Sequence, residues 1–221
     1  ANADGLYMIG DSIVITVTFT EAVGVTGTPQ VNLSTGSANT LINYVLGSGT
    51  TTLSFDYVVE SGDSVGDLGY ADTSALILNG GSINDVAGND ATLDFTTPGA
   101  DGSLAANKTL VIDGVLAVVN AVSSSSSDGT YKIGDTLNIA ITFNESVFTT
   151  GVPQLTLETG DGDAVVDYSS GSGSTTLNFS YIVFEGQSTN DLDYTTTNSL
   201  ALNGGKIKDA AGNDAILTLP V

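Results

Sequence analysis

The sequence predicts an all-β protein made of two tandem antiparallel β-sandwich modules. Three observations predict this fold class. Apolar residues alternate with polar ones, as in Ile13, Ile15 and Val17, which is the period of a half-buried strand. Turn residues separate such stretches at intervals of about 8–12 residues, as they do in sandwiches. The chain also repeats its own pattern, and no segment has the period of an amphipathic helix.

The repeat has an offset of 124 residues and runs without gaps from Asp4 to Leu93. Roughly half of the aligned positions are identical, which is far above chance for an ungapped overlap. The matching motifs are Asp-Gly-x-Tyr-x-Ile-Gly-Asp at 4–11 and 128–135, Phe-x-Glu-x-Val at 19–23 and 143–147, Gly-Ser-Gly-x-Thr-Thr-Leu at 47–53 and 171–177, and Asp-x-Ala-Gly-Asn at 85–89 and 209–213. The two halves are therefore copies of one module.

The strands follow from the alternation within each copy. In the second copy we expect A near 116–123, B at 136–144, C at 153–159, D at 163–169, E at 174–184, F at roughly 199–208 and G from 214. The first copy has the same order, but a polar insert at 96–107 interrupts its last strand, which resumes at 108–113. Such a series of short strands is typical of an Ig-like (cadherin-like) sandwich of about 100 residues.

The expected module boundaries cut through the repeat. Residues 1–114 form a first Ig-like module that lacks its first strand and has an interrupted last strand. Residues 115–221 form a second module that lacks its final strand segment. We therefore expect flanking modules on both sides, or an end strand of one chain that completes the sheet of the next by β-augmentation.

Composition excludes several classes of function. The chain has 25 acidic residues against 4 lysines, for a formal charge of −21 at pH 7. This charge repels phosphate and anionic lipid, so we expect neither nucleic-acid binding nor membrane insertion. The absence of Cys, His and Arg removes disulfides, the commonest general base and the usual nucleophile–base pairs. We therefore expect that the protein is not an enzyme.

The combined motifs carry a family resemblance. Asp-Gly-x-Tyr-x-Ile-Gly-Asp, Phe-x-Glu-x-Val, Asn-Gly-Gly-x-Ile-x-Asp-x-Ala-Gly-Asn and the Leu-Val-Ile-Asp-Gly ending at 110–114 resemble the bacterial Ig-like tandem repeats of large surface adhesins and related cell-surface proteins, over essentially the whole chain. The resemblance implies extracellular, rod-like spacer modules that are commonly stiffened by Ca²⁺. The glycine-rich Gly-Gly-x-Gly-x-Asp nonapeptides of some calcium-rich relatives are missing, so no β-roll is expected.

Acidic residues at the module ends predict a calcium site. On an Ig sandwich the AB and EF loops and the end of the last strand meet at one end of the module, and the FG loop lies at the other. Ca²⁺ takes six to eight oxygens from carboxylates and carbonyls. We expect it at or near the module junction, held by Asp4, Asp11, Asp63, Asp67, Asp113, Glu145, Asp209, Asn213 and Asp214. The alternative is that Asp85 and Asp209 cap the Ala-Gly-Asn turns and the other acids are solvated.

Two functions remain open. The first is a structural spacer whose partners are neighbouring repeat modules. The second is a module that binds a glycan or protein receptor through its end loops, which differ most between the copies at 60–72 and 184–196. Duplication favours the spacer, because a receptor-binding tip is normally unique while a spacer is repeated.

Overall fold

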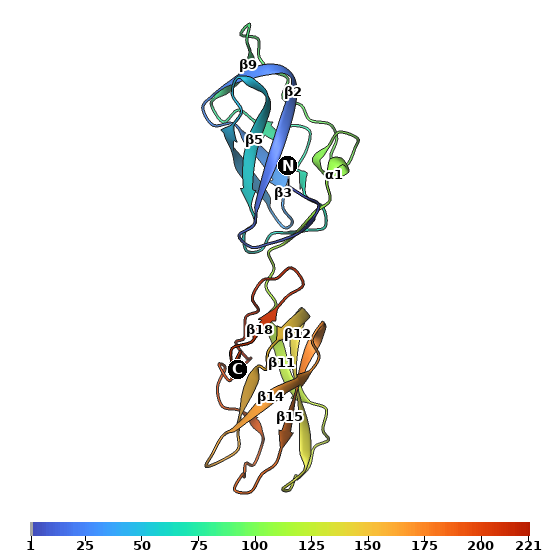
Figure 1. Ribbon diagram of the computed structural model, residues 1–221, viewed down its shortest axis with the longest axis vertical. Coiled ribbons are helices and arrows are strands. Elements are labelled where there is room, and N and C mark those ends of the chain that lie inside the picture. Colours follow the sequence, from blue (N-terminus) through green and yellow to red (C-terminus); the bar gives the residue numbers. More distant parts are fainter. Residues whose placement is uncertain (1) are drawn as a thin grey trace. The chain divides into compact units, whose positions relative to one another are not determined.

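The computed structural model describes residues 2–221, which form two compact units, a first that ends at Val115 and a second over Leu116–Val221. Both units are all-β with mainly antiparallel sheets, as predicted from the sequence (Figure 1). Each has its own core, so each is described by itself.

The first unit is a β-sandwich-like arrangement of two sheets. Its strands are β1 (Gly5–Met8), β2 (Ser12–Thr26), β3 (Gln30–Ser34), β4 (Asn39–Leu46), β5 (Thr50–Val58), β6 (Ser64–Val65), β7 (Gly69–Tyr70), β8 (Leu76–Ile77), β9 (Ser82–Asp85) and β10 (Leu110–Asp113). The larger sheet has the order β7-β3-β4-β5-β2-β9, with β8 also paired to β3. The smaller sheet has the order β1-β10-β6.

The second unit repeats the larger sheet of the first with one further strand at its edge. Its strands are β11 (Val119–Ser124), β12 (Thr136–Thr150), β13 (Gln154–Glu158), β14 (Ala164–Ser170), β15 (Ser174–Ile182), β16 (Asp193–Tyr194), β17 (Leu200–Ala201) and β18 (Lys206–Lys208). They form one sheet path, β11-β12-β15-β14-β13-β16, from which β17 pairs with β13 and β18 with β12.

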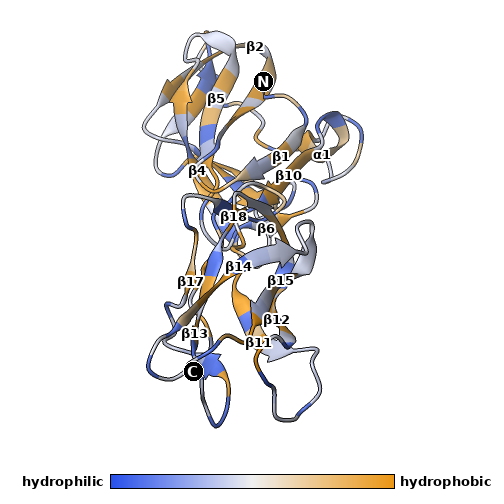
Figure 2. Ribbon diagram, turned by 60° about the horizontal axis from the view of Figure 1, so that its bottom comes forward, coloured by the Kyte–Doolittle hydropathy of each residue, from blue (hydrophilic) through white to orange (hydrophobic). Residues whose placement is uncertain are grey.

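The predicted alternation is confirmed by the burial of the strands. Along β2, Ile13 and Ile15 are buried while Val14 is exposed. Along β15, Leu177 and Phe179 are fully buried. Apolar residues lie along strands such as β10 and β12, and many loops are hydrophilic (Figure 2). The period of two thus places one face of each long strand in the core.

Three expectations at the ends of the modules need correction. Residues 5–8 match 129–132, which lie between the expected strands A and B, but they form β1 because β10 supplies a partner strand for them. The strand expected from 214 is reduced to isolated bridges, Lys208 with Asp214 and Val118 with Ile216. The polar insert contains a short helix, α1 (Leu104–Asn107), which begins where the Ser103 hydroxyl accepts from the Ala106 N–H.

Candidate functional site

The first unit brings its first and last strands together. β1 and β10 pair in parallel, with Gly5 opposite Leu110 and Met8 opposite Asp113. The Gly5 N–H also donates to the Thr109 carbonyl at 3.0 Å. On its other side β10 pairs antiparallel with β6. Two strands from opposite ends of this unit's chain are therefore hydrogen-bonded along their length.

The sequence of β10 explains its place in the sheet. Leu110 and Ile112 alternate with Val111 and are only 2% and 1% exposed, so they belong to the core of the first unit. Burying each of two such side chains stabilises the docked strand by about 1.5–3 kcal/mol. This apolar pair holds β10 between β1 and β6.

Two of the predicted calcium ligands, Asp4 and Asp67, accept hydrogen bonds at the start of β10. Asp4 Oδ1 accepts from the Thr109 N–H at 3.3 Å and lies 3.6 Å from Lys108 Nζ. Asp67 Oδ1 accepts from the Leu110 N–H at 3.2 Å. Both carboxylates therefore have local hydrogen-bonding roles that need no metal ion.

The other candidate ligands of the first unit also accept hydrogen bonds within their own loops. They are Asp11, which accepts from the Met8 N–H at 3.0 Å, Asp63, which accepts from the Tyr57 hydroxyl at 2.7 Å and the Glu60 N–H at 3.0 Å, and Asp113, which accepts from the Val115 N–H at 3.2 Å. Among the described residues of this unit, no three carboxylates of the unit's own converge on one point.

The Asp-x-Ala-Gly-Asn turns are capped by their aspartates, which confirms that prediction. Asp85 accepts from the N–H and the Nδ2 of Asn89 at 2.8 and 2.7 Å. Asp209 accepts from the Gly212 N–H and from the N–H and Nδ2 of Asn213, all at 2.8–2.9 Å. The Asn89 side chain, helped by its N–H, holds the pKa of Asp85 below its usual range. Each carboxylate thus stabilises a turn by accepting its N–H groups.

The second unit brings two of the candidate ligands close together. Glu145 on β12 and Asp209 after β18 have carboxylate oxygens within 4.8 Å of each other. Carboxylates at this distance repel unless a cation or protons compensate, and their chemistry suits Ca²⁺. Because Asp209 already accepts three hydrogen bonds, this pair supplies only part of a calcium shell.

The last two candidates have other partners. Asn213 donates its Nδ2 to Asp209. Asp214 forms an ion pair with Lys208 Nζ at 2.7 Å, and this contact holds the pKa of Asp214 below its usual range. Asp214 is exposed, so the pair is worth little in stability.

Tyr57 on β5 is buried, and its hydroxyl donates to Asp63 in the loop before β6. Burial, reinforced by the hydrogen bond to Asp63 and that residue's negative charge, raises the pKa of Tyr57 far above 10.0. In the second unit the matching Tyr181 donates to the neutral Gln187 at 2.9 Å. Burial alone raises the pKa of Tyr181.

This pair of tyrosines predicts different alkaline stabilities for the two units. A raised folded pKa favours the protonated phenol, so its contribution is complete below the unfolded pKa of about 10 and is lost as the pH rises above it. We expect the first unit to lose stability over a wider pH range above 10 than the second. We expect Asp63→Asn to narrow that range, because the amide keeps an acceptor without the charge.

Urea unfolding between pH 8 and 11.5, followed unit by unit through hydrogen exchange, measures this difference. The second unit, with Gln187 in place of the aspartate, serves as the internal control. Equal pH dependence of the wild-type and Asp63→Asn chains would contradict the assigned role of the Asp63 charge.

The parallel pairing of β1 with β10 was missed by sequence reasoning, although one signal was present. Leu-Val-Ile-Asp at 110–113 follows the insert of the first copy and is rich in apolar and β-branched residues. A short apolar stretch of this kind indicates a strand whose partner must be sought elsewhere in that module. The partner proved to be the Asp-Gly-x-Tyr-x-Ile-Gly-Asp motif.

Comparison with known protein families, with curated proteins and with solved structures finds no match for this chain. No helix among residues 2–221 has the length and apolar character needed to span a membrane. The site geometry is therefore the main basis for a functional conclusion.

Proposed function

We propose that this chain is a pair of Ig-like spacer modules that transmit tension in an extracellular surface protein, such as an adhesin, stalk or filament. The parallel pairing of β1 with β10 is the observation that carries the proposal. The resemblance of the repeat motifs to bacterial Ig-like surface repeats supports the extracellular setting. Duplication supports a repeated rather than a unique role.

The parallel direction of β1 and β10 decides how the pair responds to tension. In a parallel pair, the start of one strand and the end of the other lie at opposite ends of the ladder. Tension applied before Gly5 and after Asp113 therefore pulls β1 and β10 past each other along their length. The ladder bonds between Gly5–Met8 and Leu110–Asp113 resist together, whereas antiparallel strands pulled from adjacent ends open one bond at a time.

Single-molecule stretching of the full chain tests this function. We expect two unfolding events per chain, the one from the first unit at clearly higher force, because forced unfolding reports the barrier to breaking the pairing. Val111→Pro removes one N–H from β10 and is expected to lower the force for the first unit while leaving that of the second unchanged.

A core substitution away from β10 provides the matched control. Ile83→Ala on β9, where Ile83 is 2% exposed, is expected to cost about 2–4 kcal/mol of equilibrium stability with a smaller effect on force than Val111→Pro. A spacer function is contradicted if both units unfold at the same low force in the wild-type chain. Saturable binding of a glycan or protein by the end loops, lost on changing 184–196, would favour the receptor-binding alternative instead.

Calcium is the second part of the proposal. The proposed Ca²⁺ site of the second unit contains Glu145 and Asp209, whose carboxylate oxygens lie within 4.8 Å of each other. Backbone carbonyls and water complete the shell that Ca²⁺ requires. Bound there, the ion compensates the repulsion of the pair and fixes the 209–213 turn against β12.

Thermal unfolding with and without Ca²⁺ tests this site. A ligand that binds only the folded unit stabilises it by about 2.7 kcal/mol at a hundred times its Kd. We expect millimolar Ca²⁺ to raise the midpoint of the second unit, and Glu145→Gln to abolish that rise. Glu21→Gln, the matching position of the first copy, is the control and leaves the rise intact. If neither Ca²⁺ nor a chelator changes the thermal unfolding midpoint of the second unit, the site is ruled out.

A further inference from the structure

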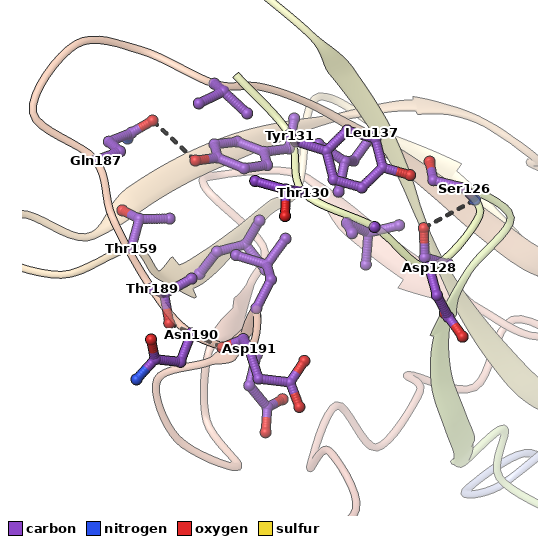
Figure 3. A pocket seen from close by; sticks show the side chains of 18 of the residues that line it. Ser126, Asp128, Thr130, Tyr131, Leu137, Thr159, Gln187, Thr189, Asn190 and Asp191 are labelled. Carbon is purple, nitrogen blue, oxygen red and sulfur yellow. Dashed lines mark hydrogen bonds between the residues drawn. The ribbon is translucent and has the colours of Figure 1, made fainter. Parts of the chain in front are cut away.

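The second unit contains a groove of about 650 Å³ beside its first long strand (Figure 3). Its apolar floor is formed by Tyr131, Leu137, Ile139, Tyr181, Val183 and Leu192. Polar residues of the loop after β15, including Gln187, Thr189 and Asp191, line its opposite side (Figure 3). An apolar floor with a polar rim is the character of a binding groove.

The first unit shows what occupies the equivalent space. The residues that match the floor at the repeat offset are Tyr7, Ile13, Ile15, Tyr57, Val59 and Leu68, and all pack in one cluster with Leu110 and Ile112 of β10. In that unit β10 lies between β1 and β6. The groove of the second unit is thus the position that a β10-like strand fills in the first.

Burial of the matched residues supports this correspondence. Val59 and Leu68 are 1% and 0% exposed beneath β10. Their counterparts Val183 and Leu192 are only half-buried. The same side chains at matched positions of the repeat differ in exposure because β10 covers them in the first unit and no strand covers them in the described second unit.

Polar contacts of the groove are also in place. Asp67 accepts from the Leu110 N–H, and the Leu68 N–H donates to the Leu110 carbonyl at 2.8 Å. Their counterparts, Asp191 and Leu192, both line the groove. Tyr181 donates to Gln187 in the groove (Figure 3), as Tyr57 donates to Asp63 in the first unit.

We propose that the groove of the second unit binds one extended β-strand of the β10 type, with apolar residues at two alternate positions followed by aspartate. The strand runs parallel to 129–132 and antiparallel to 188–189, in the register that β10 has with β1 and β6. In this register its aspartate lies opposite Lys132, one of four lysines in a chain of charge −21. Backbone pairing gives affinity, and the two apolar side chains give specificity.

The proposal rests on the internal comparison of the two units and depends neither on tension nor on calcium. The repeat provides the test. Thr97 matches Val221 at the offset of 124, so residues 98–114 can be appended after Val221 in the register of the repeat. The full chain is extended after Val221 by a copy of residues 98–114. The control chain carries the same tail with Leu110→Asp and Ile112→Asp in the appended copy alone.

Hydrogen exchange of the second unit is the measurement. We expect the tail to slow exchange at Val183 and Leu192 at least tenfold and to raise the unfolding midpoint of that unit by about 5 °C. The control tail is expected to do neither, and Asp191→Ala to reduce the effect of the first tail. These readouts are independent of unfolding force and of Ca²⁺, so they succeed or fail separately from the spacer function.

Two outcomes overturn the proposal. In the first, the two tails slow hydrogen exchange at Val183 and Leu192 equally, or neither tail slows it. The two apolar side chains then have no role in the groove. The other is protection of Val183 and Leu192 in the unextended chain that grows with protein concentration and is not displaced by the tail. That result would assign the groove to a second copy of this chain.

Discussion

Replacing Phe55 with alanine is expected to destabilise the first unit by about 3–5 kcal/mol. Phe55 lies on β5 and is fully buried, and the Tyr44 ring packs against its edge with centroids 6.1 Å apart. The substitution removes the apolar area of the ring and leaves a cavity that a rigid sheet cannot close. A loss of this size is a large part of the 5–15 kcal/mol available to a typical domain.

The repeat provides a second experiment of the same kind. Phe179 on β15 is also fully buried and packs against Tyr168 at 6.1 Å. Phe179→Ala is expected to cost the second unit the same 3–5 kcal/mol without affecting the first. Phe148→Ala, at a side chain that is 48% exposed, is the control and is expected to change stability by less than about 0.5 kcal/mol.

Calorimetry with hydrogen exchange assigned to each unit separates these effects. Each buried Phe substitution should shift one transition alone, because each unit has its own core. A single merged transition that moves with either substitution would contradict the independence of the two cores.

The long strands could be predicted from the sequence, because the alternation that marks them is also what buries them. Ile13, Ile15 and Phe55 lie in the core as their pattern indicates. The ends could not be predicted, since the same motif behaves differently in the two copies. Residues 5–8 form a strand where β10 is present, while 129–132 do not.

The candidate metal ligands show the same limit of local reasoning. Capping by Asp85 and Asp209 was predicted because an aspartate four residues before an asparagine can reach the turn's own N–H groups. The role of Asp67 could not be predicted, because it depends on Leu110, 43 residues away in the chain. Contacts between distant segments need the sheet order, which the sequence leaves open.

The Gly-Ser-Gly turns are the second place where one substitution should have a large effect. Gly47 joins β4 to β5 with φ of +116°, and a Cβ there would lie 2.1 Å from the Thr52 carbonyl oxygen. Gly171 has φ of +111° and its Cβ would lie 2.0 Å from the Thr176 oxygen. Both obstacles are backbone atoms of the adjoining strand, so no side-chain movement relieves them.

Gly47→Ala is therefore expected to destabilise the first unit by about 2–5 kcal/mol, from left-handed strain together with the forced shift of β5. Gly171→Ala should do the same to the second unit. Gly49, two residues on, has φ of +81° but no atom within 4 Å of its Cβ position, so Gly49→Ala is the matched control and should cost only about 1–2 kcal/mol. Chemical unfolding of the three variants separates the contribution of backbone strain from that of the clash with the adjoining strand.

Equal losses of stability at Gly47 and Gly49 would mean that strain alone accounts for the effect. A larger loss at Gly47 would show that the close approach of the β5 backbone adds to the strain.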